Sequence, residues 1–159
     1  MASSFDTRQF EAGLARWSRE YQQNLVKAMG QAGMMLLNEA VMDAPTVPME
    51  TGDLRGSGSV FVNGKLTGTS ENQGSGGSPA RSVEYQARPG EVICHMGFNT
   101  VYAAVMHEGR WQTGPMAGVE IRNWSEPNSG KFFLSAKLAA NGEKYVGVAV
   151  EEARRMTGM

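Results

Sequence analysis

The chain has 159 residues, of which 41% are hydrophobic, and this length fits one domain around one core. Fifteen basic and sixteen acidic side chains give a net charge of -1, which excludes a global electrostatic attraction to nucleic acid or to an anionic membrane. The single cysteine, Cys94, excludes an intrachain disulfide framework and a cysteine metal cluster, and it fits a reducing cytosol. We therefore expect residues 1–159 to form a single domain.

The N-terminal segment and the apolar stretches bear on localisation. The first ten residues have neither a basic start nor an apolar run, so we expect no signal peptide. The most apolar stretch, residues 32–38, is far shorter than the roughly 20 residues that cross a bilayer. The sequence thus predicts a soluble protein that has no membrane partner and stays inside the cell that makes it.

Residues 6–43 have the pattern of a one-sided helix that begins at a capping box formed by Asp6 and Gln9. An unbroken helix of this length would measure about 55 Å, so we expect a break at Gly30 and Gly33, each of which weakens a helix by roughly 1 kcal/mol. We also expect Trp17 in the core. The apolar residues that recur at spacings of three and four are Phe10, Leu14, Trp17, Tyr21, Leu25, Ala28, Ala32 and Met35.

The segment 44–57 ends the helix and turns the chain. Pro45 and Pro48 remove backbone donors and disfavour helical conformation in the residues before them, while Gly52 can adopt a left-handed conformation. An alternating strand, residues 57–63, follows at once. The segment is therefore predicted to be a helix stop, a turn and a strand start.

Alternation of apolar and polar residues predicts three strands, at 57–63, 82–87 and 91–98, with a weaker fourth at 119–124. A turn at 88–90 would join the second strand to the third. Residues 131–156 predict a C-terminal helix, frayed or kinked at Asn141-Gly142. The order helix, strands, helix predicts an α+β fold in which an antiparallel sheet of about four strands is packed by a long N-terminal helix and a C-terminal helix.

Residues 65–81 contain many glycines and serines and almost no apolar side chains, so they predict a flexible loop or arm within the domain. Two interpretations stay open at this point. The segment is either a tolerated surface insertion or an arm that becomes ordered against a partner.

Candidate catalytic groups are few. A zinc-protease motif beginning at His107-Glu108 would need a histidine at position 111, which is Trp111, so we interpret the pair as turn-stabilising. His95 and Cys94 are strand neighbours on opposite faces and cannot form a dyad, so Cys94 is expected to be a core side chain. We predict no catalytic, cofactor-binding or metal-binding residue. A small hydrolase using His107 or His95 remains the alternative from another functional class.

Candidate interaction residues come from composition and position. Methionine and aromatic side chains are frequent at interfaces, and core packing is the competing explanation for them. The candidates for subunit contacts are Met34, Met35, Met42, Met49, Met106, Met116 and Trp111. The basic residues around the turn and the glycine-rich segment could form a modest rim that touches phosphates, although solvated surface charge is the favoured explanation. These residues are Arg55, Lys65, Arg81 and Arg88.

Three segments, 44–57, 102–109 and 130–134, occur in an order that resembles the tail-completion, or head–tail joining (neck), proteins of long-tailed bacteriophages, often labelled putative tail component or minor capsid protein. The first resembles the family's proline turn with Thr-Gly and Leu-Arg, the second its Tyr-Ala turn with His-Glu and glycine, and the third its Phe-Leu helix start. The motif residues are Pro48, Thr51, Gly52, Leu54, Arg55, Ser57, Tyr102, His107, Glu108, Gly109, Phe133 and Leu134.

The resemblance implies a non-enzymatic virion protein, made in the host cytoplasm and located at the neck between head and tail. It would be one subunit of a cyclic homo-oligomer, six by resemblance, that completes the tail or joins it to the DNA-filled head. Its neighbours would be a connector or stopper ring and a tail-terminator or tail-tube protein, with DNA passing through the lumen without sequence-specific binding. A tail terminator or minor capsid protein is the alternative. We expect ring contacts at residues 34–42 and 65–81.

Overall fold

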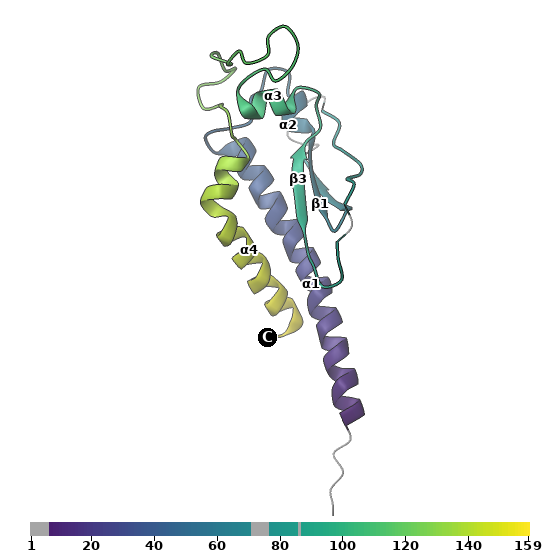
Figure 1. Cartoon of the computed structure of the whole chain (residues 1–159). Coiled ribbons are helices and arrows are strands. Elements are labelled where there is room, and N and C mark those ends of the chain that lie inside the picture. The colour runs from purple at the N-terminus through teal and green to yellow at the C-terminus, as the bar shows by residue number, and fades with distance from the viewer. Residues whose placement is uncertain (1–6, 71–76, 86) are drawn as a thin grey trace, which may run out of the picture.

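A computed structural model describes residues 7–70, 77–85 and 87–159 of the chain. It contains α1 (Thr7–Met42), α2 (Asp53–Gly56), β1 (Gly58–Val62), β2 (Lys65–Thr69), β3 (Cys94–Phe98), α3 (Ala103–Glu108) and α4 (Ser135–Thr157). α1 forms the long axis of the molecule, with α4 along one side and the sheet along another (Figure 1). The predicted α+β fold, with two long helices packed on an antiparallel sheet, is confirmed.

The sheet has three strands in the described part of the chain rather than about four, in the order β2-β1-β3, and both pairings are antiparallel. Residues 82–85 are not in a strand, and 119–124 contribute only one isolated bridge, between Glu120 and Arg110. Val83 instead lines a hollow on the outer face of the sheet with Phe61 and His95. Val83 and Tyr85 therefore pack against the outer face of the sheet and do not pair within it.

The sequence pattern did not predict β2, because the glycines and serines of residues 65–81 indicated one flexible segment. The turn before β2 is Asn63-Gly64, and both residues have positive φ, 51° and 79°, as in the tight turns that favour hairpins. β2 then pairs with β1, with Val62 opposite Lys65. The flexible-loop prediction is thus wrong for residues 65–69, and its residues 71–76 lie outside the described part.

α1 runs without a break through both glycines, so the predicted break is wrong. A Cβ on Gly33 would lie 2.6 Å from Cγ1 of Val60, and one on Gly30 would lie 3.3 Å from Cβ of Thr67. The glycines therefore let the sheet approach the helix closely, and this packing holds α1 together despite their low helix propensity. Asp6 of the predicted capping box lies outside the described residues.

α4 begins at Ser135, later than expected, and continues through Asn141-Gly142 without a break. Its buried face meets α1 through small side chains, which allow the two helices to lie close together. Trp17 is not in the core: it is 42% exposed and stacks on Tyr21. The first core cluster, between α1 and α4, consists of Ala28, Ala32, Leu36, Tyr145, Ala149 and Ala153.

β3 faces the helices as its alternation predicts. Cys94 and Met96 lie toward α1, close to where a Cβ of Gly33 would be. Phe98 packs on a second core cluster, which consists of Ala40, Val41, Val47, Leu54 and Phe133. His95 lies on the opposite face, against Tyr85, with ring centroids 4.7 Å apart. Within the described residues, no helix is both long enough and apolar enough to cross a membrane.

Candidate interaction site

The three motif segments meet at the end of the molecule where α1 stops. Val47 from the proline turn, Leu54 from α2 and Phe133 from the segment before α4 are buried in one cluster with Ala40 and Val41 of α1. The half-buried side chains packed around this cluster are Phe98, Tyr102, Ala103, Met106 and Leu134. Residues that are far apart in the sequence thus build one end of the fold.

Hydrogen bonds fasten the proline turn to α1, to the loop before α4 and, through a lysine side chain, to α4 itself. The amide of Val47 donates to the carbonyl of Ala40 over 2.8 Å, and the amide of Thr46 donates to the carbonyl of Asn128 over 2.8 Å. Lys137 of α4 is buried, and its ammonium donates to the carbonyl oxygens of Pro45, at 2.7 Å, and Phe133, at 3.2 Å. Burial lowers the pKa of Lys137, an effect that the charges of nearby acidic residues oppose.

Arg55 ties the turn to the loop that precedes α4. Its Nε donates to the carbonyl of Val47 over 2.8 Å, and its Nη2 forms an ion pair with the carboxylate of Glu126. Only 12% of the side chain is exposed. The expectation that Arg55 forms part of a phosphate-touching rim is therefore wrong, because its guanidinium is committed to the fold. Lys65 and Arg81 are exposed.

The turn into β1 depends on three further motif residues. Gly52 has φ 87°, a left-handed conformation that side chains disfavour, and it precedes α2. Ser57 is buried, and its hydroxyl donates to the carbonyl of Leu54 over 2.8 Å. The amide of Asp53 donates to the hydroxyl of Thr51 over 3.4 Å. The predicted structural role of this motif agrees with these contacts.

His107 stabilises the junction between α3 and α4. Its Nε2 accepts from the amide of Ser135 at 3.3 Å, and its Nδ1 lies 3.3 Å from a carboxylate oxygen of Glu108. The ring also meets Phe133 edge-on, with centroids 4.9 Å apart. Gly109 ends α3 with φ 69°, and a Cβ there would lie 2.9 Å from Lys131. The predicted turn-stabilising role of His107 and Glu108 is thus matched by their contacts.

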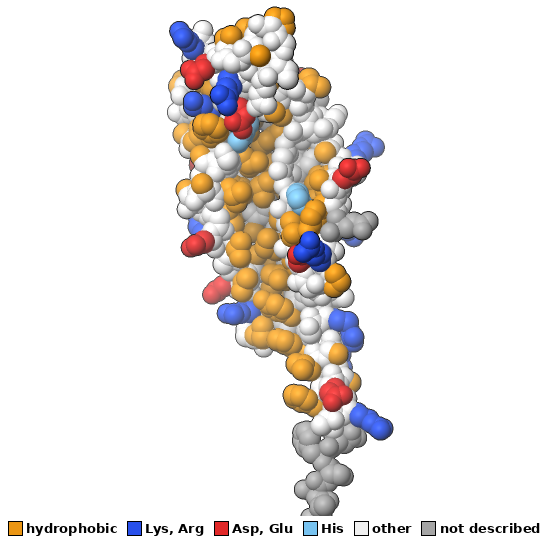
Figure 2. All heavy atoms as spheres, in the orientation of Figure 1, with side chains coloured by type: hydrophobic (Ala, Val, Ile, Leu, Met, Phe, Trp, Pro, Cys, Tyr) orange, Lys and Arg blue, Asp and Glu red, His pale blue; other side chains and the backbone are white. Residues whose placement is uncertain are grey.

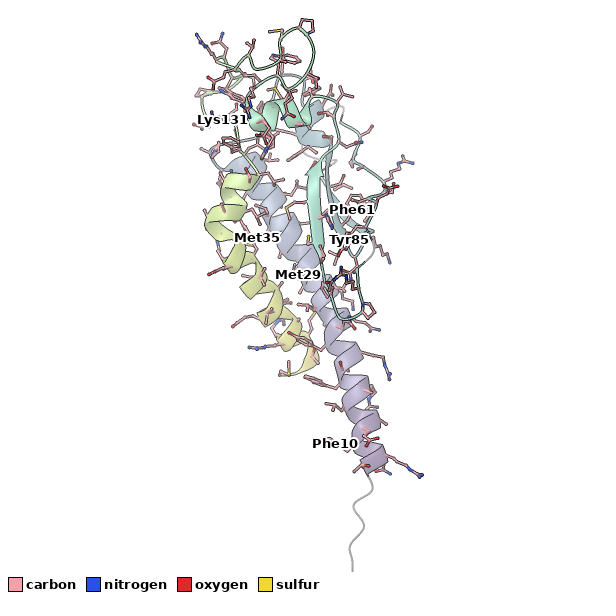
Figure 3. All side chains as sticks on the ribbon, viewed as in Figure 1. Phe10, Met29, Met35, Phe61, Tyr85 and Lys131 are labelled. Atoms are coloured by element: carbon pink, nitrogen blue, oxygen red, sulfur yellow. The ribbon has the colours of Figure 1, made fainter. Side chains whose placement is uncertain are left out.

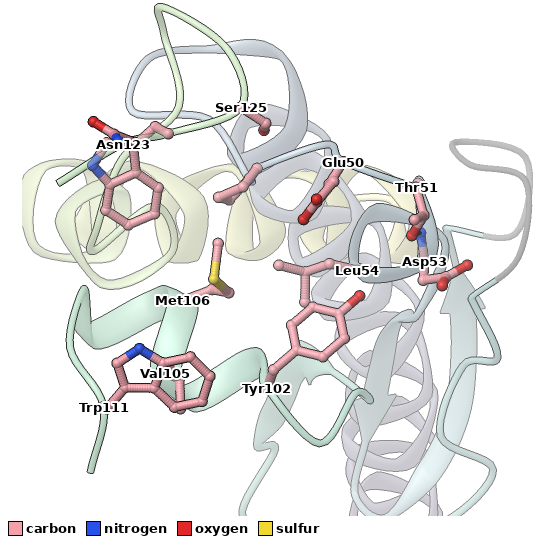
Figure 4. A pocket seen from close by; sticks show the side chains of 13 residues that line it. Glu50, Thr51, Asp53, Leu54, Tyr102, Val105, Met106, Trp111, Asn123 and Ser125 are labelled. Atoms are coloured by element: carbon pink, nitrogen blue, oxygen red, sulfur yellow. Dashed lines mark hydrogen bonds between the residues drawn. The ribbon is translucent and has the colours of Figure 1, made fainter. Parts of the chain in front are cut away.

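An open cavity of about 860 Å³ lies beside the buried cluster, at the motif end of the molecule (Figure 4). Tyr102 and Met106 from the second motif segment face it, as do Leu54 and the indole of Trp111 (Figure 4). Two carboxylates, Glu50 and Asp53, are also part of its lining. The other lining residues are Pro48, Thr51, Gly52, Val105, Asn123, Trp124 and Ser125.

Composition alone made Trp111 a candidate for a contact surface, and Trp124 was not predicted to be a site residue. Both lie in the segment between α3 and α4, where the weak alternation at 119–124 does not produce a strand and no other pattern assigns a face to either side chain. The available signal was compositional, because large aromatic side chains need a surface to lie against. The fold brings them to the same cavity as Tyr102.

The methionines expected at subunit contacts differ in their surroundings. Met34 covers β2 at Gly68, and Met35 packs on the first core cluster, so both are half-buried within the chain. Met42 is 73% exposed. Met34 and Met35 also line a shallow groove of about 620 Å³ between α1 and β2. Part of the surface expected at residues 34–42 is therefore occupied by the chain's own sheet.

Cys94 is not part of a catalytic arrangement in the described residues. Burial raises the pKa of its thiol to about 11, which keeps it protonated at neutral pH. His95 points to the other face of the sheet, and its Nε2 is buried without a hydrogen-bond partner. Across the described ranges, no group of three or more histidine, cysteine, aspartate or glutamate side chains is arranged to hold a metal ion.

Comparisons with known proteins add no relative. No protein-family model, curated protein or solved structure matches the chain.

Proposed function

We propose that the chain is a non-enzymatic virion protein, a ring subunit in the head–tail connector (neck) region of a long-tailed bacteriophage. The observation that carries this proposal is the meeting of the three motif segments in one packed end, through Leu54, Tyr102 and Phe133. The resemblance to neck proteins rests on three short motifs. If this chain has the fold of those proteins, the three motifs should contact one another, as they do here. The contacts of Arg55 and His107 give the motif a structural purpose that needs no catalysis.

An aromatic cavity next to the motif cluster supports an assembly role. Tryptophan, tyrosine and methionine are enriched where proteins contact one another, and Trp111, Trp124, Tyr102 and Met106 line this cavity. The carboxylates of Glu50 and Asp53 favour a partner segment that carries a positive charge. A neighbouring neck protein that inserts such a segment is the partner we propose for this end of the subunit.

The sheet supports a closed ring. β2 and β3 are its outer strands, and each pairs with β1 on one side only. In the described part of the chain, no further strand pairs with the outer edge of either. Pairing β2 of one copy with β3 of the next would join two different surfaces, and this kind of contact closes into a ring when the rotation fits. The net charge of -1 also suits a channel through which DNA passes, since a basic lumen would retain its phosphates.

Electron microscopy of phage particles labelled with an antibody against this chain tests the proposal. We expect label at the neck, and particles made without the chain should separate into filled heads and unattached tails. Label over the capsid would favour the minor capsid alternative. Absence of the chain from particles would exclude a virion role.

Ring formation has its own test in neck complexes released from phage particles. We expect native mass spectrometry to show a closed oligomer, six copies by resemblance, and Leu66→Lys on β2 to weaken it by placing a charge at the sheet edge. Val119→Lys is the matched control, because Val119 is also exposed but lies outside the sheet. Equal rings from both variants would show that β2 is not an edge of the ring contact.

A further inference from the structure

α1 extends well past the helix that packs on it. The side-chain amide of Asn24 donates to the hydroxyl of Thr157 over 3.0 Å, and this contact marks the end of α4 along α1. From Asn24 to Thr7, α1 continues for about 25 Å at 1.5 Å per residue. Figure 1 shows this stretch projecting beyond the rest of the fold. We call residues 7–23 the overhang.

The overhang exposes a stripe of large apolar side chains. Phe10 is 64% exposed, Leu14 53% and Trp17 42%. Tyr21, at the end of the stripe, is half-buried beside the first core cluster and stacks on Trp17 with centroids 5.9 Å apart. Figure 3 shows Phe10 directed to the side on which α4 lies, and Figure 2 shows hydrophobic side chains along that side of the overhang, with charged groups on the other. The stripe continues the face that α1 turns to α4.

The spacing of this stripe is the same in both directions. Phe10, Leu14, Trp17 and Tyr21 are separated by four, three and four residues. An identical helix running antiparallel can therefore lay Tyr21 opposite Phe10 and Trp17 opposite Leu14, and each contact occurs twice about a two-fold axis. The stripe is complementary to itself.

The same register fits the space that α4 leaves open. It brings Thr7 of the second copy next to Asn24, where α4 ends, so the second helix fills the uncovered length without meeting α4. The residues that flank the stripe meet those on the same side of the other copy. Glu20 of one copy lies near Gly13 of the other, and Glu11 lies near Ser18 of the other, so no like charges face each other. The self-complementary spacing of the stripe, and an uncovered length that one further copy of the overhang fills, favour a second copy of this chain as the partner.

We propose that the free chain forms a two-fold dimer in which two overhangs pair antiparallel through Phe10, Leu14, Trp17 and Tyr21. The dimer goes beyond the proposed function and does not depend on it. A neck ring presents different faces to head and tail and so has no two-fold axis across it. If the chain assembles such a ring, the dimer is the form of the free subunit and opens first.

The first test measures the mass of the full chain in solution by light scattering over a hundredfold range of concentration. We expect a dimer, and we expect Leu14→Glu to raise its dissociation constant at least a hundredfold. Ala12→Glu is the matched control, because it adds the same side chain to an exposed position of the overhang away from the stripe. A monomer at every concentration, or equal weakening by both variants, would overturn the proposal.

The second test fixes the register by disulfide cross-linking in a Cys94→Ala background. Phe10→Cys mixed with Tyr21→Cys should give a cross-linked pair under mild oxidation, while each variant alone should not, because two copies of one position would lie about 16 Å apart. Cross-linking of each variant with itself would indicate a parallel pair and contradict the proposed dimer. This outcome leaves the location of the protein in particles unaffected, so the two proposals fail separately.

Discussion

Gly33 on α1 lies directly against Val60 on β1, so close that a Cβ at position 33 would come within 2.6 Å of the Cγ1 of Val60. The Sγ of Cys94 would be 2.7 Å away. A glycine expected to interrupt a helix thus serves as the contact point between helix and sheet. We therefore expect alanine at position 33 to destabilise the fold, although alanine has a higher helix propensity than glycine.

Gly33→Ala should lower the free energy of unfolding. Overpacking a well-filled core costs typically about 1–3 kcal/mol, and the gain of helix propensity, roughly 1 kcal/mol, offsets only part of it. Gly147→Ala in α4 is the control, because no heavy atom lies within 4 Å of its Cβ position, and it should stabilise by about 0.5–1 kcal/mol. Urea denaturation compares the two, and stabilisation by both would show that helix and sheet have room to separate.

Arg55→Met should destabilise the motif end by about 1–3 kcal/mol, because Val47 and Glu126 lose a charged hydrogen-bond donor. Arg55→Lys should recover only part of this loss, since an ammonium cannot reproduce the planar fork of a guanidinium. A double-mutant cycle with Glu126→Gln measures the coupling between the two side chains by urea denaturation. Strictly additive costs would mean that the ion pair contributes nothing.

His107→Ala should lower the melting temperature, because the amide of Ser135 loses its acceptor and Phe133 loses an aromatic neighbour. The expected cost is about 1–3 kcal/mol. Differential scanning calorimetry provides the measurement. An unchanged melting temperature together with loss of a hydrolytic activity would instead support the alternative in which His107 is catalytic.

Cys94 should make stability fall in alkaline solution. Its pKa is about 11 in the folded chain against an ordinary value of 9.0, so the folded state holds the thiol proton more tightly than the unfolded state. The resulting stabilisation is complete below pH 9 and is lost as the pH rises from 9 to 11.

Cys94→Ala removes this titration, so its unfolding free energy should decline less steeply than that of the natural chain over that pH window. Denaturant unfolding at several pH values between 8 and 11 measures both slopes. Tyr145, whose pKa is raised to about 12, is present in both the natural chain and Cys94→Ala, so it changes the two stabilities equally. Identical slopes would show that the thiol is as accessible in the folded chain as in the unfolded one.

The sequence by itself determined the features that depend on local patterns. Spacings of three and four gave α1 its length and its apolar face, two prolines ended it at the right place, and alternation put Cys94 and His95 on opposite sides of β3. It also identified the motif segments whose Leu54 and Phe133 share one cluster. These features are readable because each follows from the conformation of neighbouring residues.

Tertiary structure decided everything that depends on which surfaces meet. Gly30 and Gly33 remain helical because the sheet packs on them, and β2 forms because β1 offers it hydrogen-bonding partners despite its weak pattern. Trp17 has the periodicity of a core residue, yet it is exposed. The reason is that the last residue of α4, Thr157, lies beside Asn24, so α4 leaves the turn of α1 around Trp17 uncovered. Periodicity specifies which face of an element is apolar, but the lengths and positions of its neighbours determine whether that face is buried.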